Sequence, residues 1–217
     1  LGLLDAGARV TAVEIDARLA AQLPLTVAEL APDAATRLTV ITADAMKVAD
    51  LPGAPKRLVA NLPYNVSVPV LLHLLQTVPS LESALVMVQA EVGQCIAAAP
   101  GSKIYGSPSV KAAWYGTWST AGSVSRQVFW PVPNVDSILV SFRRADSLPG
   151  SEEERAEVFA LVDGAFGQRR KMLRQALAEQ LGGSAAASTR LEAAGVDPTL
   201  RGEQLSMPDF LAIARAH

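Results

Sequence analysis

Short apolar runs alternate with helical patterns through the first half of the chain. A β-branched run at residues 8–16 closes on two acids, and the apolar positions of residues 17–30 then repeat with helical spacing. Further apolar runs, each followed by a turn or a helical pattern, lie at 38–41, 58–60 and 83–88. Strands that alternate with helices predict parallel βαβ units in a sheet that is covered on both faces.

The pattern changes after residue 101. Extended runs at residues 110–118, 123–129 and 138–142 are separated by glycine, serine and proline. We expect these runs to complete the sheet, with an antiparallel element at one edge.

The C-terminal part of the chain has a helical pattern. A linker-like stretch precedes a capping box formed by Ser151 and Glu154, and apolar positions then keep helical spacing in one uninterrupted pattern until two adjacent glycines stop it. The pattern predicts an α/β domain over residues 1–145 and a small all-helical C-terminal domain over residues 151–217.

Composition narrows the class of protein. Half of the 217 residues are apolar, yet no apolar run approaches the roughly 20 residues of a membrane span, which excludes a transmembrane role. The single cysteine, Cys95, excludes an internal disulfide and a thiolate metal cluster, and two histidines leave little room for a multi-histidine metal site. We expect a cytoplasmic protein with no metal and no membrane partner.

Polar residues directly follow three of the predicted strands. In an open α/β sheet, ligands bind beyond the carboxyl ends of the strands, where the sequence places Glu14, Asp44 and Asn61. An acid at the end of one strand can accept both hydroxyls of a ribose, and an aspartate after the next strand can accept from the adenine amine. The same two acids could instead cap the helices that follow them.

Asn61, Leu62, Pro63 and Tyr64 form the first candidate catalytic element. Proline fixes the backbone and forces Leu62 into an extended conformation, so the asparagine amide and the neighbouring carbonyls are held rigidly. Two acceptors on the hydrogens of an exocyclic amine favour a pyramidal nitrogen with a localised lone pair, and alignment for in-line displacement then needs no strong base. An ordinary Asn-Pro turn is the alternative interpretation.

The second candidate element runs from Phe129 to Ser137 as Phe-Trp-Pro-Val-Pro-Asn-Val-Asp-Ser. Two prolines stiffen a loop that carries aromatic side chains, which would bring Phe129 against a base flipped out of its stack. The alternative is a rigid connector with Phe129 and Trp130 in the core.

Together with further segments, these elements resemble, in order, the small-subunit ribosomal RNA adenine dimethyltransferases, the kasugamycin-resistance methyltransferase family. The matching segments are VEID at 13–16, ADA at 43–45, NLPY at 61–64, MVQ at 87–89, the FxPxPxVxS loop at 129–137 and FGQRRKMLR at 166–174. Many amine methyltransferases share the NxPY element, whereas FGQRRKMLR points to the ribosome-maturation branch. The resemblance implies a Rossmann-like class I methyltransferase sheet with helices on both faces.

The resemblance also implies a role for each matching position. The positions that would bind S-adenosylmethionine are Glu14 at its ribose, Asp44 at its adenine amine, Ile15 and Ala45 on either side of that adenine, and Asn61. The target amine would be held by Asn61, Leu62 and Pro63, with Tyr64 and Phe129 enclosing the target base. The family dimethylates two adjacent adenosines in a hairpin loop near the 3′ end of 16S rRNA and acts on the immature 30S subunit.

The resemblance has three departures. The family's first strand and glycine-rich loop have no counterpart after Leu1, so we expect the front of the fold to precede this chain. Ala90 stands where the family often has lysine, and Pro108 replaces an apolar residue. Neither of these two lies in the predicted methyl-transfer element.

Charge is distributed unevenly. A net charge of −2 is unusual for an RNA-binding protein, because phosphate contacts dominate the affinity for nucleic acids. Residues 100–145, however, have a local net charge of +4. The candidate RNA contacts are cations of this region and of one predicted helix, namely Lys103, Lys111, Arg169, Arg170, Lys171 and Arg174. A solvated helix face is the alternative for the last four.

Two other functions remain open on sequence grounds. One is a non-catalytic ribosome-assembly factor that keeps the methyltransferase fold for docking. The other is a large-subunit rRNA adenine methyltransferase of the erythromycin-resistance type, which the basic FGQRRKMLR segment disfavours. We expect the dimethyltransferase to be a monomer.

Overall fold

The computed structural model describes residues 1–216, which form two compact units. The first unit consists of Leu1–Leu58 and Val66–Glu82, and the second consists of Val59–Asn65 and the chain from Ser83 onward. No helix among the described residues is both long and apolar enough to cross a membrane.

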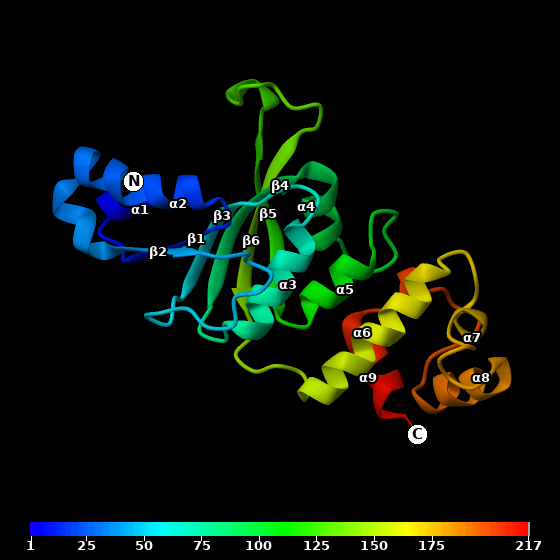
Figure 1. Ribbon diagram of the computed structural model, residues 1–217. Helices are drawn as coiled ribbons and strands as arrows, with labels where there is room; N and C mark the ends of the chain where they lie inside the picture. Colours follow the sequence, from blue (N-terminus) through cyan, green and yellow to red (C-terminus); the bar gives the residue numbers. More distant parts are fainter. Residues whose placement is uncertain (217) are drawn as a thin grey trace. The chain divides into compact units, whose positions relative to one another are not determined.

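The first unit is built on two parallel strands (Figure 1). β1 (Val10–Glu14) pairs with β2 (Leu38–Thr42), so that Val10 lies opposite Leu38 and Glu14 lies opposite Thr42. The helical segments of this unit are α1 (Gly2–Asp5), α2 (Ala17–Leu30), η1 (Pro32–Arg37) and α3 (Ser67–Thr77). The predicted order of strand, helix and parallel strand is confirmed here.

A small apolar core and one arginine hold the N-terminal part of this unit together. Val27 of α2 is buried in a cluster with Leu4 and Ala34. The guanidinium of Arg37 donates to the carbonyl oxygens of Leu4 (2.7 Å) and Ala8 (3.2 Å). Arg37 therefore joins α1 to the segment that leads from this helix into β1.

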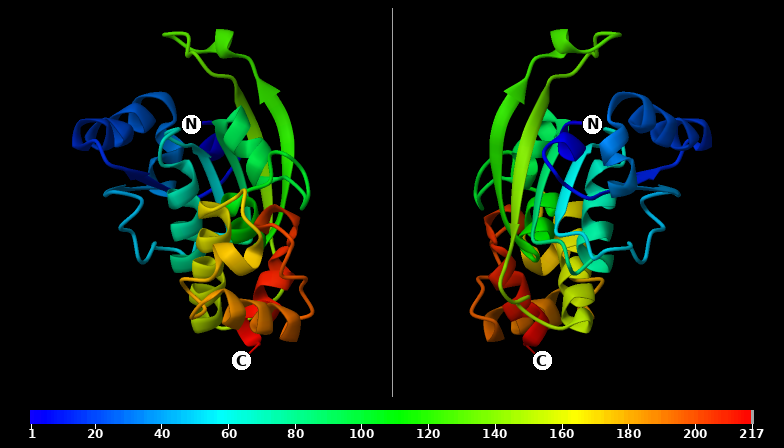
Figure 2. Two further views of the ribbon diagram at one scale, coloured as in Figure 1. Left: turned by 90° about the vertical axis from the view of Figure 1, so that its right-hand side faces the viewer. Right: turned by 90° about the vertical axis from the view of Figure 1, so that its left-hand side faces the viewer.

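A four-stranded sheet in the order β3-β4-β6-β5 belongs to the second unit, except for the first two residues of β3, Arg57 and Leu58. Its strands are β3 (Arg57–Asn61), β4 (Ser83–Gln89), β5 (Gly116–Val124) and β6 (Ser137–Arg144). β6 runs antiparallel to both of its neighbours, which confirms the predicted antiparallel element. Figures 1 and 2 show β5 and β6 as a long hairpin whose connecting loop projects away from the helices of this unit.

Helix α4 (Ala90–Ile96) packs closely on this sheet. Gly93 makes the close approach possible, because a Cβ at that position would collide with the side chains of Ile138 and Val140 on β6. Val88 and Val140 are fully buried in the sheet. The apolar alternation of β4 therefore marks the side on which the helix lies.

The prediction of extended chain at residues 110–118 is wrong over its first half. Helix α5 (Ser107–Ala113) occupies this segment, and β5 begins only at Gly116. Proline in the first turn favours a helix start, which Pro108 provides, and Ser109 Oγ accepts from the N–H of Gly106 at 3.0 Å. These local signals outweigh the strand propensity of the residues that follow.

The C-terminal segment is helical, as predicted, but its first helix is interrupted. The helices are α6 (Glu152–Gly167), α7 (Leu173–Ala176), α8 (Ser184–Ala193), η3 (Gly202–Gln204) and α9 (Met207–Arg215). The predicted capping box at Ser151 is confirmed. The uninterrupted helix is wrong, because the N–H groups of Leu173 and Arg174 bond the carbonyl oxygens of Leu200 (2.7 Å) and Pro198 (3.2 Å) instead of those of the preceding turn.

Tyr105 links the segment after α4 to the C-terminal helices. Its side chain is buried, its hydroxyl donates to the carbonyl oxygen of Leu205 at 2.9 Å, and its ring lies 6.0 Å from that of Phe166. Burial, with a smaller contribution from the negative charge of Asp209, raises the pKa of Tyr105 to about 12. The neutral phenol is therefore the form that the folded state favours.

We predict that Tyr105→Phe lowers the free energy of unfolding by about 1 kcal/mol at pH 7, because the Leu205 carbonyl loses its donor. The phenol of Tyr105 stabilises the fold fully below pH 10, and this contribution disappears as the pH rises through about 12. Urea denaturation should therefore show a difference between wild type and variant that shrinks from pH 10 to 12. An undiminished difference at the higher pH would contradict the assignment.

Candidate active site

One cavity of the second unit brings the two candidate catalytic elements together. It is lined by Asn61, Leu62, Pro63, Tyr64, Phe129, Trp130, Pro131 and Pro133. Its volume of about 380 Å³ lies within the range of small-molecule pockets. The structure therefore places all five predicted catalytic positions around one space, which the sequence suggested only through two separate motifs.

The end of β3 is anchored by Leu62. The Leu62 side chain is buried, and its backbone N–H donates to the carbonyl oxygen of Met87 on β4 at 3.1 Å. Asn61 and Pro63, on either side, are exposed. Because the sheet holds Leu62 from both its backbone and its side chain, the polar groups of residues 61–63 are presented from a rigid edge.

Tyr64 is positioned by a residue that the sequence did not single out. Its hydroxyl lies 2.7 Å from Oγ of Ser137, and Ser137 is buried at the first position of β6. Ser137 lies opposite Gln89 on one neighbouring strand and opposite Val124 on the other. The final serine of the FxPxPxVxS pattern was the available signal, because a polar residue at the start of a buried strand needs a partner.

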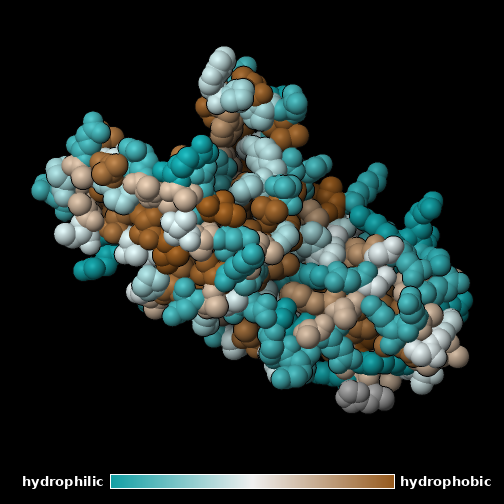
Figure 3. Space-filling model, in the orientation of Figure 1, coloured by the Kyte–Doolittle hydropathy of each residue, from teal (hydrophilic) through white to brown (hydrophobic). Residues whose placement is uncertain are grey.

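The loop between β5 and β6 carries the other wall of the cavity. Phe129 is half-buried with extended backbone, and an ion pair of 3.1 Å between Arg126 and Asp136 joins the two ends of the loop. The Asp136 carbonyl oxygen also accepts from the N–H of Ala90 at 2.9 Å. Hydrophobic residues are visible on the tip of this hairpin in Figure 3. The alternative that places Trp130 in the core is wrong, since this residue is 95% exposed.

The predicted cofactor acids lie at one edge of the two-stranded sheet in the first unit. Glu14 ends β1, and the N–H of Ala43 extends the pairing by donating to the Glu14 carbonyl oxygen at 3.0 Å. Asp44 follows directly. One carboxylate oxygen of Glu14 accepts from the N–H of Asp16, and one of Asp44 accepts from the N–H of Met46, both at 2.9 Å. Each acid is thus oriented by its own turn and keeps further acceptor capacity.

Neither acid serves as a helix cap. The N-cap of α2 is Asp16, whose carboxylate accepts from the N–H groups of Arg18 (2.8 Å) and Leu19 (3.4 Å). A hydrogen bond to Arg18 lowers the pKa of Asp16. Asp44 begins a turn rather than a helix. The capping alternative is therefore wrong for both Glu14 and Asp44.

The surroundings of these acids suit an adenosine group. Ile15 is 69% exposed beside Glu14, and Ala45 is half-buried beside Asp44. Carboxylates that accept from hydroxyls and amines, next to accessible apolar side chains, are the combination that a ribose and a purine require. The residues present thus fit the adenosine half of the cofactor that the resemblance implies.

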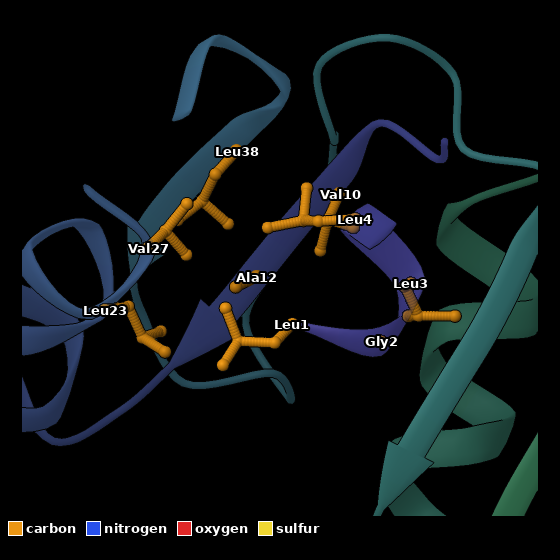
Figure 4. A pocket seen from close by; sticks show the side chains of 9 residues that line it. All are labelled: Leu1, Gly2, Leu3, Leu4, Val10, Ala12, Leu23, Val27 and Leu38. Carbon is orange, nitrogen blue, oxygen red and sulfur yellow. The ribbon is translucent and has the colours of Figure 1, made fainter. Parts of the chain in front are cut away.

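Another cavity lies in the first unit and differs from the candidate active site in its lining. Its volume is about 420 Å³, and its lining is Leu1, Gly2, Leu3, Leu4, Val10, Ala12, Leu23, Val27 and Leu38 (Figure 4). All of these side chains are apolar or absent. A cavity without convergent polar groups cannot orient a reacting amine or a charged cofactor, so it is not a candidate active site.

The residues predicted to contact RNA differ in whether they already pair with a carboxylate. Lys111 pairs with Asp163 at 2.6 Å, and Arg169 pairs with Glu203 at 2.8 Å. Arg170 and Lys103 are exposed. Within residues 1–216, Arg170 forms no ion pair with a carboxylate. The cations of the QRRK run therefore differ in how far they are already neutralised.

The four basic residues of FGQRRKMLR do not lie on one helix, contrary to the prediction. α6 ends at Gly167, so Arg169, Arg170 and Lys171 lie in the connecting turn, and only Arg174 belongs to α7. The physical reason is that the first N–H groups of α7 bond the carbonyl oxygens of Leu200 and Pro198 rather than those of a preceding helical turn. Arg169, Arg170 and Lys171 are exposed in this turn, so the alternative of a solvated charge run is corrected only in that the segment is not helical.

Comparison with known proteins agrees with the resemblance. The family model described as ribosomal RNA adenine dimethylase matches residues 3–216. The ribosomal RNA small subunit methyltransferase A of Leifsonia xyli subsp. xyli is 70% identical over 214 residues, which cover 99% of this chain and 76% of that protein. The protein of the same name from Thermobifida fusca is 57% identical over 215 residues, covering 99% of this chain and 75% of that protein.

Solved structures share the fold. The crystal structure of a dimethyladenosine transferase from Plasmodium falciparum has a TM-score of 0.78 at 21% identity, covering 94% of this chain and 80% of that one. The crystal structure of the 23S rRNA methyltransferase ErmE has a TM-score of 0.65 at 21% identity, covering 96% and 81%. These likenesses show the Rossmann-like α/β fold of class I methyltransferases. Because the family model spans almost the whole chain and the two relatives are more than half identical to it, the chain belongs to the ribosomal RNA adenine dimethylases, which transfer methyl groups to adenine in rRNA.

Proposed function

We propose that this enzyme uses S-adenosylmethionine to dimethylate the exocyclic amines of two adjacent adenosines in a hairpin loop near the 3′ end of 16S rRNA. Its substrate would be the immature 30S subunit in the cytoplasm, so that modification accompanies subunit biogenesis, and it would act as a monomer without a metal. The observation that carries the proposal is the single cavity shared by residues 61–64 and Phe129. The names of the relatives favour the small subunit over the large one.

The cavity supplies the means to activate an aromatic amine. In the proposed mechanism, the amide oxygen of Asn61 and the backbone carbonyl oxygen of Leu62 accept the two hydrogens of the target amine. This arrangement localises the nitrogen lone pair and directs it toward the methyl group to be transferred. The effect is electrostatic preorganisation rather than strong-base catalysis. S-adenosylmethionine, when bound, supplies an electrophilic methyl group. Pro63 lacks an N–H and so adds no competing donor.

The aromatic walls would hold the flipped base. Tyr64 and Phe129 contribute flat faces to the same cavity, and aromatic stacking on either side of a base restricts its orientation. The hydrogen bond between the hydroxyls of Tyr64 and Ser137 fixes the end of the tyrosine ring. Orientation of this kind can supply several kcal/mol of a reaction barrier.

The acids of the first unit would hold the cofactor. Glu14 would accept from the ribose hydroxyls and Asp44 from the adenine amine, with Ile15 and Ala45 against the purine faces. This assignment is supported by the orientation of both carboxylates through backbone donors and by the exposure of Ile15.

Residues 151–217 would form the domain that recognises the ribosomal particle. Lys103, Arg170, Lys171 and Arg174 would contact phosphates, which position RNA without reading its sequence. Lys111 and Arg169 would first have to exchange a carboxylate partner for a phosphate. Their contribution to binding is therefore expected to be smaller.

Replacing Asn61 tests the catalytic assignment. We predict that Asn61→Ala lowers kcat for methylation of immature small subunits by about 10²–10³-fold, the usual effect of removing one preorganised polar group. Binding of the particle, measured by co-sedimentation, should be retained, because the amide acts on the reacting amine. Asn65→Ala removes an exposed amide that does not line the cavity and serves as the matched control. A non-catalytic assembly factor predicts unchanged labelling and cell growth with Asn61→Ala.

Isosteric neutralisation tests the cofactor acids. Glu14→Gln and Asp44→Asn should each weaken binding of S-adenosylmethionine by about ten- to a hundred-fold, because a hydrogen bond to a charged group contributes about 1.5–3 kcal/mol. Isothermal titration calorimetry would measure this affinity. Glu29→Gln, at an exposed position on α2, is the control. Equal affinities for all three variants would argue against the assignment.

Salt dependence tests the RNA contacts. Joint replacement of Arg170, Lys171 and Arg174 by glutamine should flatten the dependence of log affinity on log salt by about two units, since each lost phosphate contact contributes roughly 0.7–0.9. The measurement is particle binding across a salt series. The control replaces three exposed cations of the first unit, namely Arg9, Lys56 and Arg57. Identical slopes for the two triple variants would contradict a specific role of the connecting turn.

A further inference from the structure

The loop between β5 and β6 carries apolar side chains at the cavity and further apolar side chains that are exposed. Phe129, Pro131 and Pro133 line the cavity. The residues that alternate with them are exposed, with Val128 at 70%, Trp130 at 95% and Val132 at 54%. Val128, Trp130 and Val132 therefore form an outward apolar strip, and Trp130 connects this strip to the cavity that it also lines.

The position of Trp130 is unusual for so large an apolar side chain. Tryptophan is highly buried on average, and Trp114 in the same unit is 1% exposed. Trp130 also contributes to the rim of the cavity. A fully accessible indole directly beside a base-sized cavity indicates that the ring meets a ligand that is continuous with the cavity's occupant.

Base flipping creates such a ligand. When an adenosine leaves its stack to enter an active site, the base next to it in the RNA loses a stacking partner. The energetic penalty falls if the protein offers an aromatic surface at the point where the neighbouring base emerges. Within the outward strip, Trp130 borders the same cavity as Phe129, so its exposed ring lies where that base would emerge.

We infer that Trp130 is a stacking platform for the nucleotide that adjoins the target adenosine, with the loop 128–133 inserted between the two bases. This inference rests on the proposed function of the cavity. The strip consists of one indole and two valines, which matches one base. A stable protein interface requires about 1,200 Å² or more of buried surface, so a single nucleobase is the occupant that fits.

The test uses a stem-loop RNA with the two adjacent adenosines in its loop, and two versions in which the nucleotide on the 5′ or the 3′ side of the target is abasic. Fluorescence anisotropy measures their affinities for the wild-type protein and for Trp130→Ala. Stacking on an aromatic side chain predicts a loss of about ten-fold on the intact RNA for the variant. The variant should lose nothing further on one of the two abasic RNAs, which identifies the neighbour that stacks.

Two more variants separate stacking from general effects. Trp130→Phe keeps an aromatic face and should retain most of the affinity, whereas Leu148→Ala removes an exposed apolar side chain outside the cavity and should change nothing. The exposed indole should also lose accessibility to acrylamide when the intact RNA binds.

An equal loss on all three RNAs, no loss with Trp130→Ala, a shift in the oligomeric state of that variant, or no binding of the intact RNA by the wild type would each overturn the inference. Failure of the proposed function has a different signature. It would be the absence of methyl transfer from S-adenosylmethionine to immature small subunits by the wild-type protein, and the binding comparison does not depend on turnover.

Discussion

The attachment of Leu62 to the sheet is the constraint on which the candidate active site depends. Its N–H bonds the Met87 carbonyl oxygen at 3.1 Å, and its side chain is buried. A single hydrogen bond contributes only about 1 kcal/mol of net stability, but this one also fixes the orientation of the backbone at the end of β3. With Leu62 held against the sheet, its exposed neighbours Asn61 and Pro63 are fixed beside it, and all three line the cavity.

Ser137, at the start of β6, and Asp136, just before it, organise the opposite wall. Ser137 holds the Tyr64 hydroxyl, and Asp136 uses its carbonyl oxygen to bond Ala90 and its carboxylate to pair with Arg126. The loop that presents Phe129 is therefore anchored where it enters the strand. The exposed ion pair alone would contribute little. The buried serine and the backbone bond are the stronger restraints, because leaving either partner without a bond would be costly.

Ion pairs in the C-terminal part of the chain divide the cations into two groups. Lys111 and Arg169 bridge segments that are distant in sequence, through Asp163 and Glu203. Such cations stabilise the arrangement of helices and are partly neutralised. The cations that remain exposed in the turn after α6 have no equivalent restraint among the pairs recorded for residues 1–216. A long-range field from the whole chain is weak at a net charge of −2, so local clusters must provide any attraction for RNA.

The sequence by itself determined the βαβ order, the antiparallel end of the sheet, the helical C-terminal segment and the two motifs that line the cavity. These features follow from short-range periodicity, capping residues and proline, whose effects act within a few positions. Only the tertiary structure decided that α6 stops at Gly167, that Ser137 meets Tyr64 and that Trp130 faces outward. Each of these features depends on which distant residues a segment meets in the folded chain. Local periodicity contains no information about such contacts.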